Sequence, residues 1–193
     1  DSSTSRGLGD VYKRQEADMQ KNGGLLRKED LAACEPVYTE PLVGSYRGFE
    51  VATNQLPGGG LMILQMLNIL ENFDLSMLGH NSAKFIALVV EAMKYATINK
   101  DNFMGDPKFV DVPEDKLLSK EYATMIAEKI RSGEKANVER INTGAPESKD
   151  TTHLVVADRS GNLINLTHSL GSSSGVITDG LGFMYNNLSL IHI

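Results

Sequence analysis

The sequence is poor in the residues that make cross-links, metal sites and membrane spans. Its single cysteine, Cys34, excludes an internal disulfide and a Cys-x-x-Cys metal site. A lone cysteine usually behaves as a small apolar residue, so it says little about the redox compartment. No stretch approaches the roughly 20 apolar residues needed to cross a bilayer, and the polar first residues lack the apolar segment of a signal peptide. We therefore expect no membrane-spanning segment.

Clusters of positive charge are also missing. The 193 residues include 19 Lys and Arg against 25 Asp and Glu, which gives a net charge of −6. Nucleic-acid backbones are bound by clustered basic side chains, so we expect no nucleic acid among the partners. The hydrophobic share of 41% is enough for a packed core, and the length suits one domain or two.

The familiar metal and phosphate motifs are absent. His80, His153 and His168 lack the spacing with carboxylates or cysteines that a metal site needs. Residues 57–60, Pro-Gly-Gly-Gly, precede an expected helix whose N-terminus could bind a phosphate, but neither GxxxxGKS/T nor GxGxxG occurs. We therefore expect neither a metal nor another cofactor.

The two ends of the chain carry little regular pattern. Residues 1–15 have no convincing helical or strand period, and residues 188–193 form a short apolar tail. Both segments resemble translated adaptor sequence, and the alternative is a disordered native tail at each end. We expect the functional residues to lie within residues 16–187.

Residues 16–131 are predicted to be mainly helical. A polar helix, a Gly-Gly break and a short second helix are expected within residues 16–33, and serines 82 and 119 are typical helix N-caps. The other expected elements are an extended pair with a Tyr-Arg-Gly turn at 42–53, helices at about 61–72, 82–98 and 119–131, and an ordered loop at 105–113.

The composition changes abruptly after residue 150. Residues 132–150 are rich in Gly, Asn, Ser and Pro, which is typical of a flexible linker. Two strand-like runs follow, at 153–158 and 163–170, around a turn that contains Gly161-Asn162. We therefore predict a β-hairpin directly after the linker.

The side chains predict the register of this hairpin. If the numbers of opposed residues sum to 320, one face is wholly apolar and faces a core, and the other face is mostly polar. A slip by one residue would mix the two faces. This register places Thr151 opposite Ser169 and His153 opposite Thr167, while His168 points to the other face.

Thr151 could become reactive if it were a chain start. A threonine hydroxyl is a weak nucleophile until a base takes its proton. A cut between Asp150 and Thr151 would free an α-amine with a reference pKa of about 7.7–8, which can act as that base. Ser169 could orient the hydroxyl. The alternative is that Asp150 and Thr151 simply begin a strand, because Thr-Thr-His after a polar linker is common by chance.

Several segments, in the same order, resemble the gamma-glutamyltransferase family over about residues 16–187. The segments MQKNGGLLRKEDLA, SYRGFEV, QMLNILENFDL and GDPKFVDVP are similar to its large subunit. Thr151-Thr152-His153, the following VVAD, Gly161-Asn162 and Asn186-Asn187 are similar to its processing site.

The resemblance implies an α/β protein of the N-terminal-nucleophile hydrolase class, an αββα sandwich that is incomplete in this chain. Residues 16–150 would end the large subunit and residues 151–187 would begin the small one, cut from one precursor between Asp150 and Thr151. Thr151 would be the nucleophile, and Ser169 would be the second hydroxyl that pairs with it. The substrate would be a γ-glutamyl amide such as glutathione, hydrolysed or transferred through an acyl-enzyme.

One position departs from the family pattern. Members specific for γ-glutamyl groups commonly have asparagine two residues after the second hydroxyl, and this chain has Gly171, which has no side-chain amide. A related amidase or acylase with another substrate, or a non-catalytic relative, therefore stays open.

The resemblance also bears on activity and compartment. It places the glycine pair of the oxyanion hole and the substrate-binding arginine outside these 193 residues, so we expect this chain alone to be inactive. Family members are often exported, which would mean the periplasm or the extracellular space, but the sequence carries no signal and does not decide the compartment.

Overall fold

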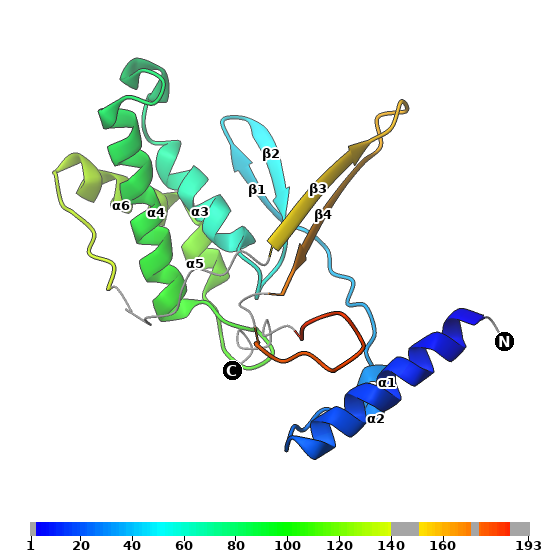
Figure 1. Ribbon diagram of the computed structural model, residues 1–193. Helices are drawn as coiled ribbons and strands as arrows, with labels where there is room; N and C mark the ends of the chain where they lie inside the picture. The colour runs from blue at the N-terminus through cyan, green and yellow to red at the C-terminus, as the bar shows by residue number, and fades with distance from the viewer. Residues whose placement is uncertain (1–2, 140–150, 171–173, 186–193) are drawn as a thin grey trace. The chain divides into compact units, whose positions relative to one another are not determined.

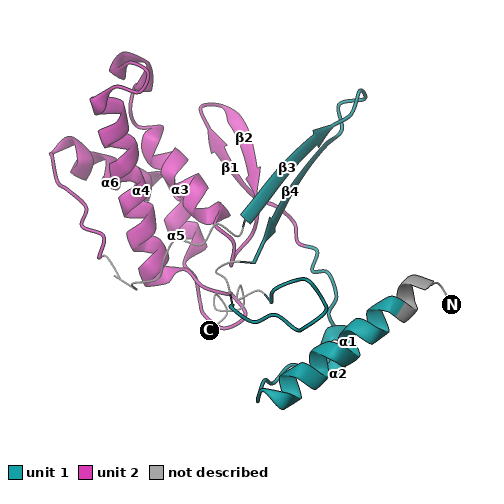
Figure 2. Cartoon of the chain, viewed as in Figure 1, with its two compact units in different colours: residues 1–38, 144–190 teal, residues 39–143, 191–193 magenta. Residues whose placement is uncertain are grey.

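The computed structural model describes residues 3–139, 151–170 and 174–185 (Figure 1). The chain divides into two compact units (Figure 2): one holds the described residues of 1–38 and 144–190, and the other holds residues 39–139. Both helices and strands are present, as the α/β prediction requires. Within the described ranges, no helix is long and apolar enough to cross a membrane.

The second unit is built around a buried helix. Its elements are β1 (Leu42–Tyr46), β2 (Phe49–Thr53), α3 (Gly60–Leu70), the 3-10 helix η1 (Leu75–Leu78), α4 (Ala83–Phe103), α5 (Glu114–Leu118) and α6 (Lys120–Arg131). Helix α3 contacts both strands as well as α4, α5 and α6. Its Leu61, Leu64 and Ile69 are at most 1% exposed, and each such side chain contributes about 1.5–3 kcal/mol of burial free energy.

The two strands of this unit form a tight hairpin against α3. Strands β1 and β2 are antiparallel, and Arg47 and Gly48 in the turn both have positive φ, as in the two-residue turns that match strand twist. An added Cβ at Gly44 would lie 2.9 Å from the Leu64 side chain. Glycine therefore permits the close approach of β1 to α3.

The predicted helix starts are confirmed. The Ser82 hydroxyl accepts the Phe85 N–H at the start of α4, and the Ser119 hydroxyl accepts the Tyr122 N–H at the start of α6. Helix α4 continues to Phe103 rather than ending near residue 98, and α3 ends at Leu70. The short segments η1 and α5 are not predicted from the sequence.

Polar side chains of α3 hold α5 in place. The buried Gln65 donates from Nε2 to the Leu117 carbonyl at 3.2 Å, and Asn68 donates from Nδ2 to the Leu118 carbonyl at 2.9 Å. The last carbonyls of a helix have no partner inside the helix. These two amides therefore satisfy the end of α5 and explain why polar residues occur on the buried face of α3.

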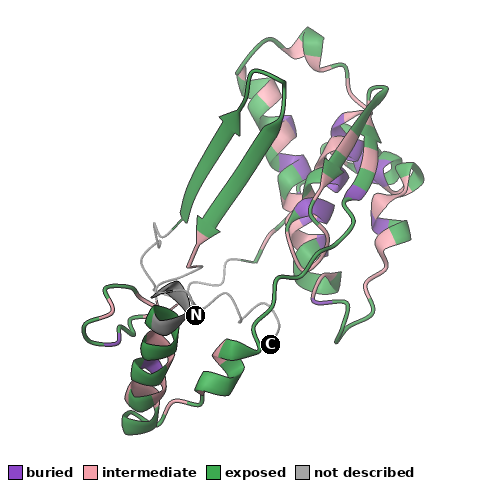
Figure 3. Cartoon of the chain, turned by 90° about the vertical axis from the view of Figure 1, so that its right-hand side faces the viewer, coloured by how far each residue is buried: buried purple, intermediate pink, exposed green. Residues whose placement is uncertain are grey.

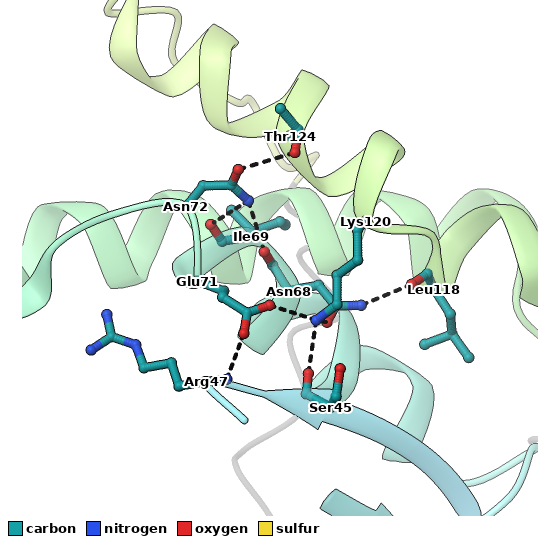
Figure 4. Close-up of polar contacts among 9 residues, drawn as sticks. All are labelled: Ser45, Arg47, Asn68, Ile69, Glu71, Asn72, Leu118, Lys120 and Thr124. Carbon is teal, nitrogen blue, oxygen red and sulfur yellow. Dashed lines mark hydrogen bonds and ion pairs between the residues drawn. The ribbon is translucent and has the colours of Figure 1, made fainter. Parts of the chain in front are cut away.

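The ammonium group of Lys120 on α6 joins the β1–β2 hairpin to α3 (Figure 4). Lys120 Nζ donates to the Ser45 carbonyl at 2.8 Å, to Asn68 Oδ1 at 2.6 Å and to Glu71 Oε2 at 2.6 Å. The other Glu71 oxygen accepts the backbone N–H of Arg47 in the turn. The Lys120 hydrogen bond, followed by the Arg47 N–H, holds the pKa of Glu71 below its ordinary value.

The first unit consists of α1 (Ser3–Lys21), α2 (Lys28–Ala32), β3 (Thr151–Ala157) and β4 (Leu163–Ser169), together with the segment 174–185. The break at Gly23-Gly24 and the short helix after it are confirmed. The expectation that residues 1–15 lack a helix is wrong, because α1 begins at Ser3. Gly7 and Gly9 lower its intrinsic helix propensity, whereas an i,i+4 ion pair between Asp10 and Arg14, at 3.0 Å, supports it.

Replacing Glu71 with Gln is expected to lower the free energy of unfolding of the 193-residue chain by about 1 kcal/mol at pH 7. The folded-state pKa of Glu71 is lowered. Its stabilisation is therefore present above the unfolded value of 4.5 and is lost as the pH falls through the folded-state pKa. Urea unfolding at pH 7 and pH 3 measures this difference.

The matched control is Glu50→Gln, which removes an exposed carboxylate from the same hairpin. A Glu71→Gln difference that is as large at pH 3 as at pH 7 would show that the charge of Glu71 is not the cause.

Candidate active site

The side chain of Asp158 organises the turn between β3 and β4. Its Oδ1 accepts the N–H groups of Ser160 and Asn162 at 2.8 and 2.9 Å, and its Oδ2 accepts the Asn162 side-chain amide at 2.7 Å. Gly161 in the turn has a φ of 85°, which glycine adopts without strain. The Asn162 contacts, with those of Ser160, hold the pKa of Asp158 below its ordinary value.

This turn fixes the strand register, and the predicted register is confirmed. Strands β3 and β4 are antiparallel, with Thr151 opposite Ser169, His153 opposite Thr167 and Val155 opposite Asn165. Because side chains alternate along a strand, the hydroxyls of Thr151 and Ser169 lie on one face at the open end of the hairpin. Their oxygens are 2.8 Å apart, within hydrogen-bonding distance.

A second polar pair continues along the same face. His153 Nδ1 lies 2.8 Å from Thr167 Oγ1, in agreement with the predicted register, which places these two residues opposite each other. Thr152 pairs with His168, and both point to the opposite face. The hairpin thus presents two hydroxyls and, one pair further along, an imidazole bonded to a third hydroxyl.

The hydroxyl pair can orient a nucleophile, but it does not itself supply a base. Each hydroxyl has one proton and two lone pairs, so Ser169 can accept the Thr151 proton in a hydrogen bond or donate its own to Thr151. A serine or threonine hydroxyl is a weak nucleophile until a base takes its proton. The nitrogen of Thr151 becomes basic only as a free α-amine.

Beyond the Thr152–His168 pair, the opposite face of the hairpin is apolar and exposed. Figure 3 shows both strands as exposed along almost their whole length. The apolar face includes Leu154, Val156, Ile164 and Leu166, which are 44–65% exposed. The expectation that this face packs in a core is therefore wrong for the described residues, because the apolar clusters of the described chain belong to the second unit.

Two of the predicted site residues lie outside the described residues. Asp150, before the expected cut, and Gly171, at the expected substrate position, are both in this group. The structure thus brings together Thr151 and Ser169 and adds the His153–Thr167 pair.

The role of Asp158 was missed in the sequence analysis, which based the turn on Gly161-Asn162. A signal was present, because aspartate commonly accepts backbone N–H groups just after it in a turn.

Comparison with known proteins identifies the family. Residues 8–190 match the sequence model of the family described as Gamma-glutamyltranspeptidase. The chain belongs to the gamma-glutamyltranspeptidase family. The match begins at residue 8, inside the segment that lacked a recognisable pattern.

Individual relatives agree with this family assignment. A glutathione hydrolase proenzyme from Escherichia coli (strain K12) is 40% identical over 185 residues, which cover 93% of this chain and 32% of the relative. The solved structure of gamma-glutamyltranspeptidase from Helicobacter pylori is 44% identical over 62% of this chain and 35% of that one, with a TM-score of 0.59. A cephalosporin acylase structure from Bacillus halodurans is 30% identical and covers 93% of this chain and 32% of that one, with a TM-score of 0.72.

These relatives confirm the predicted fold class, an α/β N-terminal-nucleophile hydrolase. The chain spans about a third of the length of the relatives it matches. Accordingly, the described residues contain two two-stranded sheets rather than a complete αββα sandwich. The relatives include a glutathione hydrolase proenzyme and an acylase proenzyme from Pseudomonas sp. (strain V22), which is 38% identical over 172 residues that cover 88% of this chain and 31% of the relative.

Proposed function

We propose that this chain spans the subunit junction of a self-processing N-terminal-threonine hydrolase or transferase that acts on γ-glutamyl amides such as glutathione. The observation that carries the proposal is the 2.8 Å contact between the hydroxyls of Thr151 and Ser169. Family membership supports the reaction class, and the relative named glutathione hydrolase proenzyme supports both maturation by cleavage and the substrate.

The first step is cleavage of the chain. The Thr151 hydroxyl, oriented by Ser169, attacks the carbonyl carbon of Asp150, and the peptide bond rearranges to an ester with release of the Thr151 amine. Water then hydrolyses the ester, which regenerates the hydroxyl and leaves a carboxylate on Asp150. Residues 16–150 become the end of the large subunit, and residues 151–187 become the start of the small subunit.

The second stage is turnover of the substrate. The free α-amine of Thr151 takes the proton of its own hydroxyl, and the oxygen attacks the amide carbonyl of the substrate. The tetrahedral intermediate needs hydrogen-bond donors at its oxyanion, which the family resemblance assigns to a segment outside this chain. The leaving amine takes the proton, and the acyl-enzyme is released by water or by an acceptor amine.

The exposed apolar face of the hairpin fits this proposal. In a complete αββα sandwich, a two-stranded piece is part of a larger sheet whose apolar face packs on a neighbouring layer. The polar face then carries Thr151 and Ser169 on the side that binds substrate.

A Thr151→Ala variant of the complete precursor is expected to remain uncleaved and to lose activity by at least about a thousandfold, because both steps use the same hydroxyl. A denaturing gel and hydrolysis of a γ-glutamyl anilide measure the two effects. The matched control is Thr152→Ala, which removes the adjacent hydroxyl from the opposite face and should still give two bands. A single band from the unmutated precursor would instead support a non-catalytic relative.

A Ser169→Ala variant is expected to cleave and turn over about tenfold more slowly, which is the effect of losing one hydrogen bond of roughly 1.4 kcal/mol. Ser169→Thr retains the hydroxyl and should restore both rates. Single-turnover rates of cleavage and steady-state rates with glutathione provide the measurement. Equal rates in Ser169→Ala and the parent protein would remove Ser169 from the mechanism.

A second candidate function is hydrolysis of an amide without a γ-glutamyl group. It is favoured by Gly171, where a side-chain amide would be expected for γ-glutamyl binding, and by similarity to a cephalosporin acylase.

Gly171→Asn in the complete enzyme is expected to raise kcat/KM for glutathione relative to an aliphatic amide, because the new side chain can hydrogen-bond the amino-acid end of the substrate. Comparison of kcat/KM for the two substrates, in the parent and in the variant, measures this change. A parent enzyme that prefers the aliphatic amide would identify it as an acylase.

A further inference from the structure

A buried polar contact joins two distant segments of the first unit. Thr178 is only 4% exposed. Its hydroxyl donates to Asp18 Oδ2 at 2.7 Å, and the Tyr185 hydroxyl lies 2.8 Å from the same Thr178 oxygen. Since the single proton of Thr178 goes to the carboxylate, Tyr185 must be the donor in the second bond. The three groups form a directed chain from Tyr185 through Thr178 to Asp18, which we call the polar clasp.

Local structure holds both ends of the clasp in place. Thr178 begins a turn in which the Leu181 N–H donates to the Thr178 carbonyl, with Gly180 at a φ of 75°. The Tyr185 N–H donates to the Val176 carbonyl, which brings Tyr185 back beside Thr178. Asp18 lies on helix α1, so its carboxylate is carried by a regular element.

Neighbouring side chains of α1 contribute to the same contact region. An added Cβ at Gly180 would lie 3.5 Å from Arg14 Nη1, so the Arg14 side chain passes close to the turn. Arg14 and Asp18 are four residues apart and therefore share one face of α1. Gln15, between them, is only 5% exposed. This face of α1 is thus the one directed at the segment 176–185.

We propose that the polar clasp holds the two products of chain cleavage together. The inference rests on the proposed cut before Thr151, which would leave Asp18 on one product and Thr178 and Tyr185 on the other. The partner surface for α1 is then the segment 176–185 of the second product. A hydrogen bond to a carboxylate is stronger than one between neutral groups, and burial of Thr178 shields the bond from competing water.

The test uses the 193-residue chain with a protease recognition site inserted between residues 140 and 150. Cleavage by the added protease makes the two pieces whether or not the chain can cleave itself. An affinity tag on the first piece then measures, across a urea series, how fast the second piece is released. Thr178→Val keeps the size of the side chain and removes the hydroxyl, and we expect release to be about tenfold faster or more.

Matched variants separate the clasp from general damage. Asp18→Asn and Tyr185→Phe should also speed release of the second piece. Thr178→Ser keeps the hydroxyl and should retain the slow release of the parent chain. Asp179→Asn, at the exposed neighbouring position, should leave the release rate unchanged. Circular dichroism of each uncut variant checks that the chain still folds. If the uncut form of another variant does not fold, the parent is compared with Tyr185→Phe alone, because this change deletes a single oxygen.

The role of the polar clasp and the proposed function can be contradicted separately. Release rates that are the same in the parent, Thr178→Val and Tyr185→Phe would overturn the proposal that the polar clasp holds the two products together. A complete precursor that never cleaves before Thr151 would overturn the proposed function, while the rates measured after protease cleavage would still report on the contact itself.

Discussion

The candidate site depends on the register of one hairpin. The Asp158 carboxylate accepts three N–H groups in the turn, and the strands leave this turn with Ala157 opposite Leu163. Every later pair follows from that start, including Thr151 with Ser169 at the far end. A slip by one residue would turn one of these hydroxyls to the other face, so the chemistry of the open end is determined at the turn.

The sequence could predict this arrangement because the two faces of the hairpin differ so clearly in polarity. The same is true of the second unit, where Ser82 and Ser119 mark helix starts and the apolar α3 marks the centre of the core. What could not be predicted depends on contacts between distant residues. The sequence predicted the polar helix from residue 16 on but not residues 3–15 of α1, where Gly7 and Gly9 lower the helix propensity. Nothing local indicates that Asp18 contacts a threonine 160 residues later. The short helix α5 is stabilised at its end by amides of α3, which are distant in the sequence.

The chemical role of the site required more than local physics. A threonine beside a serine on neighbouring strands is an ordinary cross-strand pair. The catalytic interpretation of the pair came from the family motifs upstream of it, and the family match over residues 8–190 supports that interpretation. Substrate choice is harder to predict, because the resemblance assigns it to position 171 and to groups in other parts of the precursor.

The division of the chain into compact units does not coincide with the proposed division into subunits. The cut before Thr151 would fall within the first unit, whose described residues come from both sides of the cut. Breaking one peptide bond would therefore free the α-amine of Thr151 without separating two independent bodies. The second unit keeps its own contacts, among them the Lys120 hydrogen bonds to Ser45 and Glu71, and all of these residues precede the cut. Cleavage can thus create a new chain end at the hairpin while the non-covalent contacts on either side of the cut stay unchanged. The nucleophile needs both conditions, because its amine must be freed and its hydroxyl must already be in position.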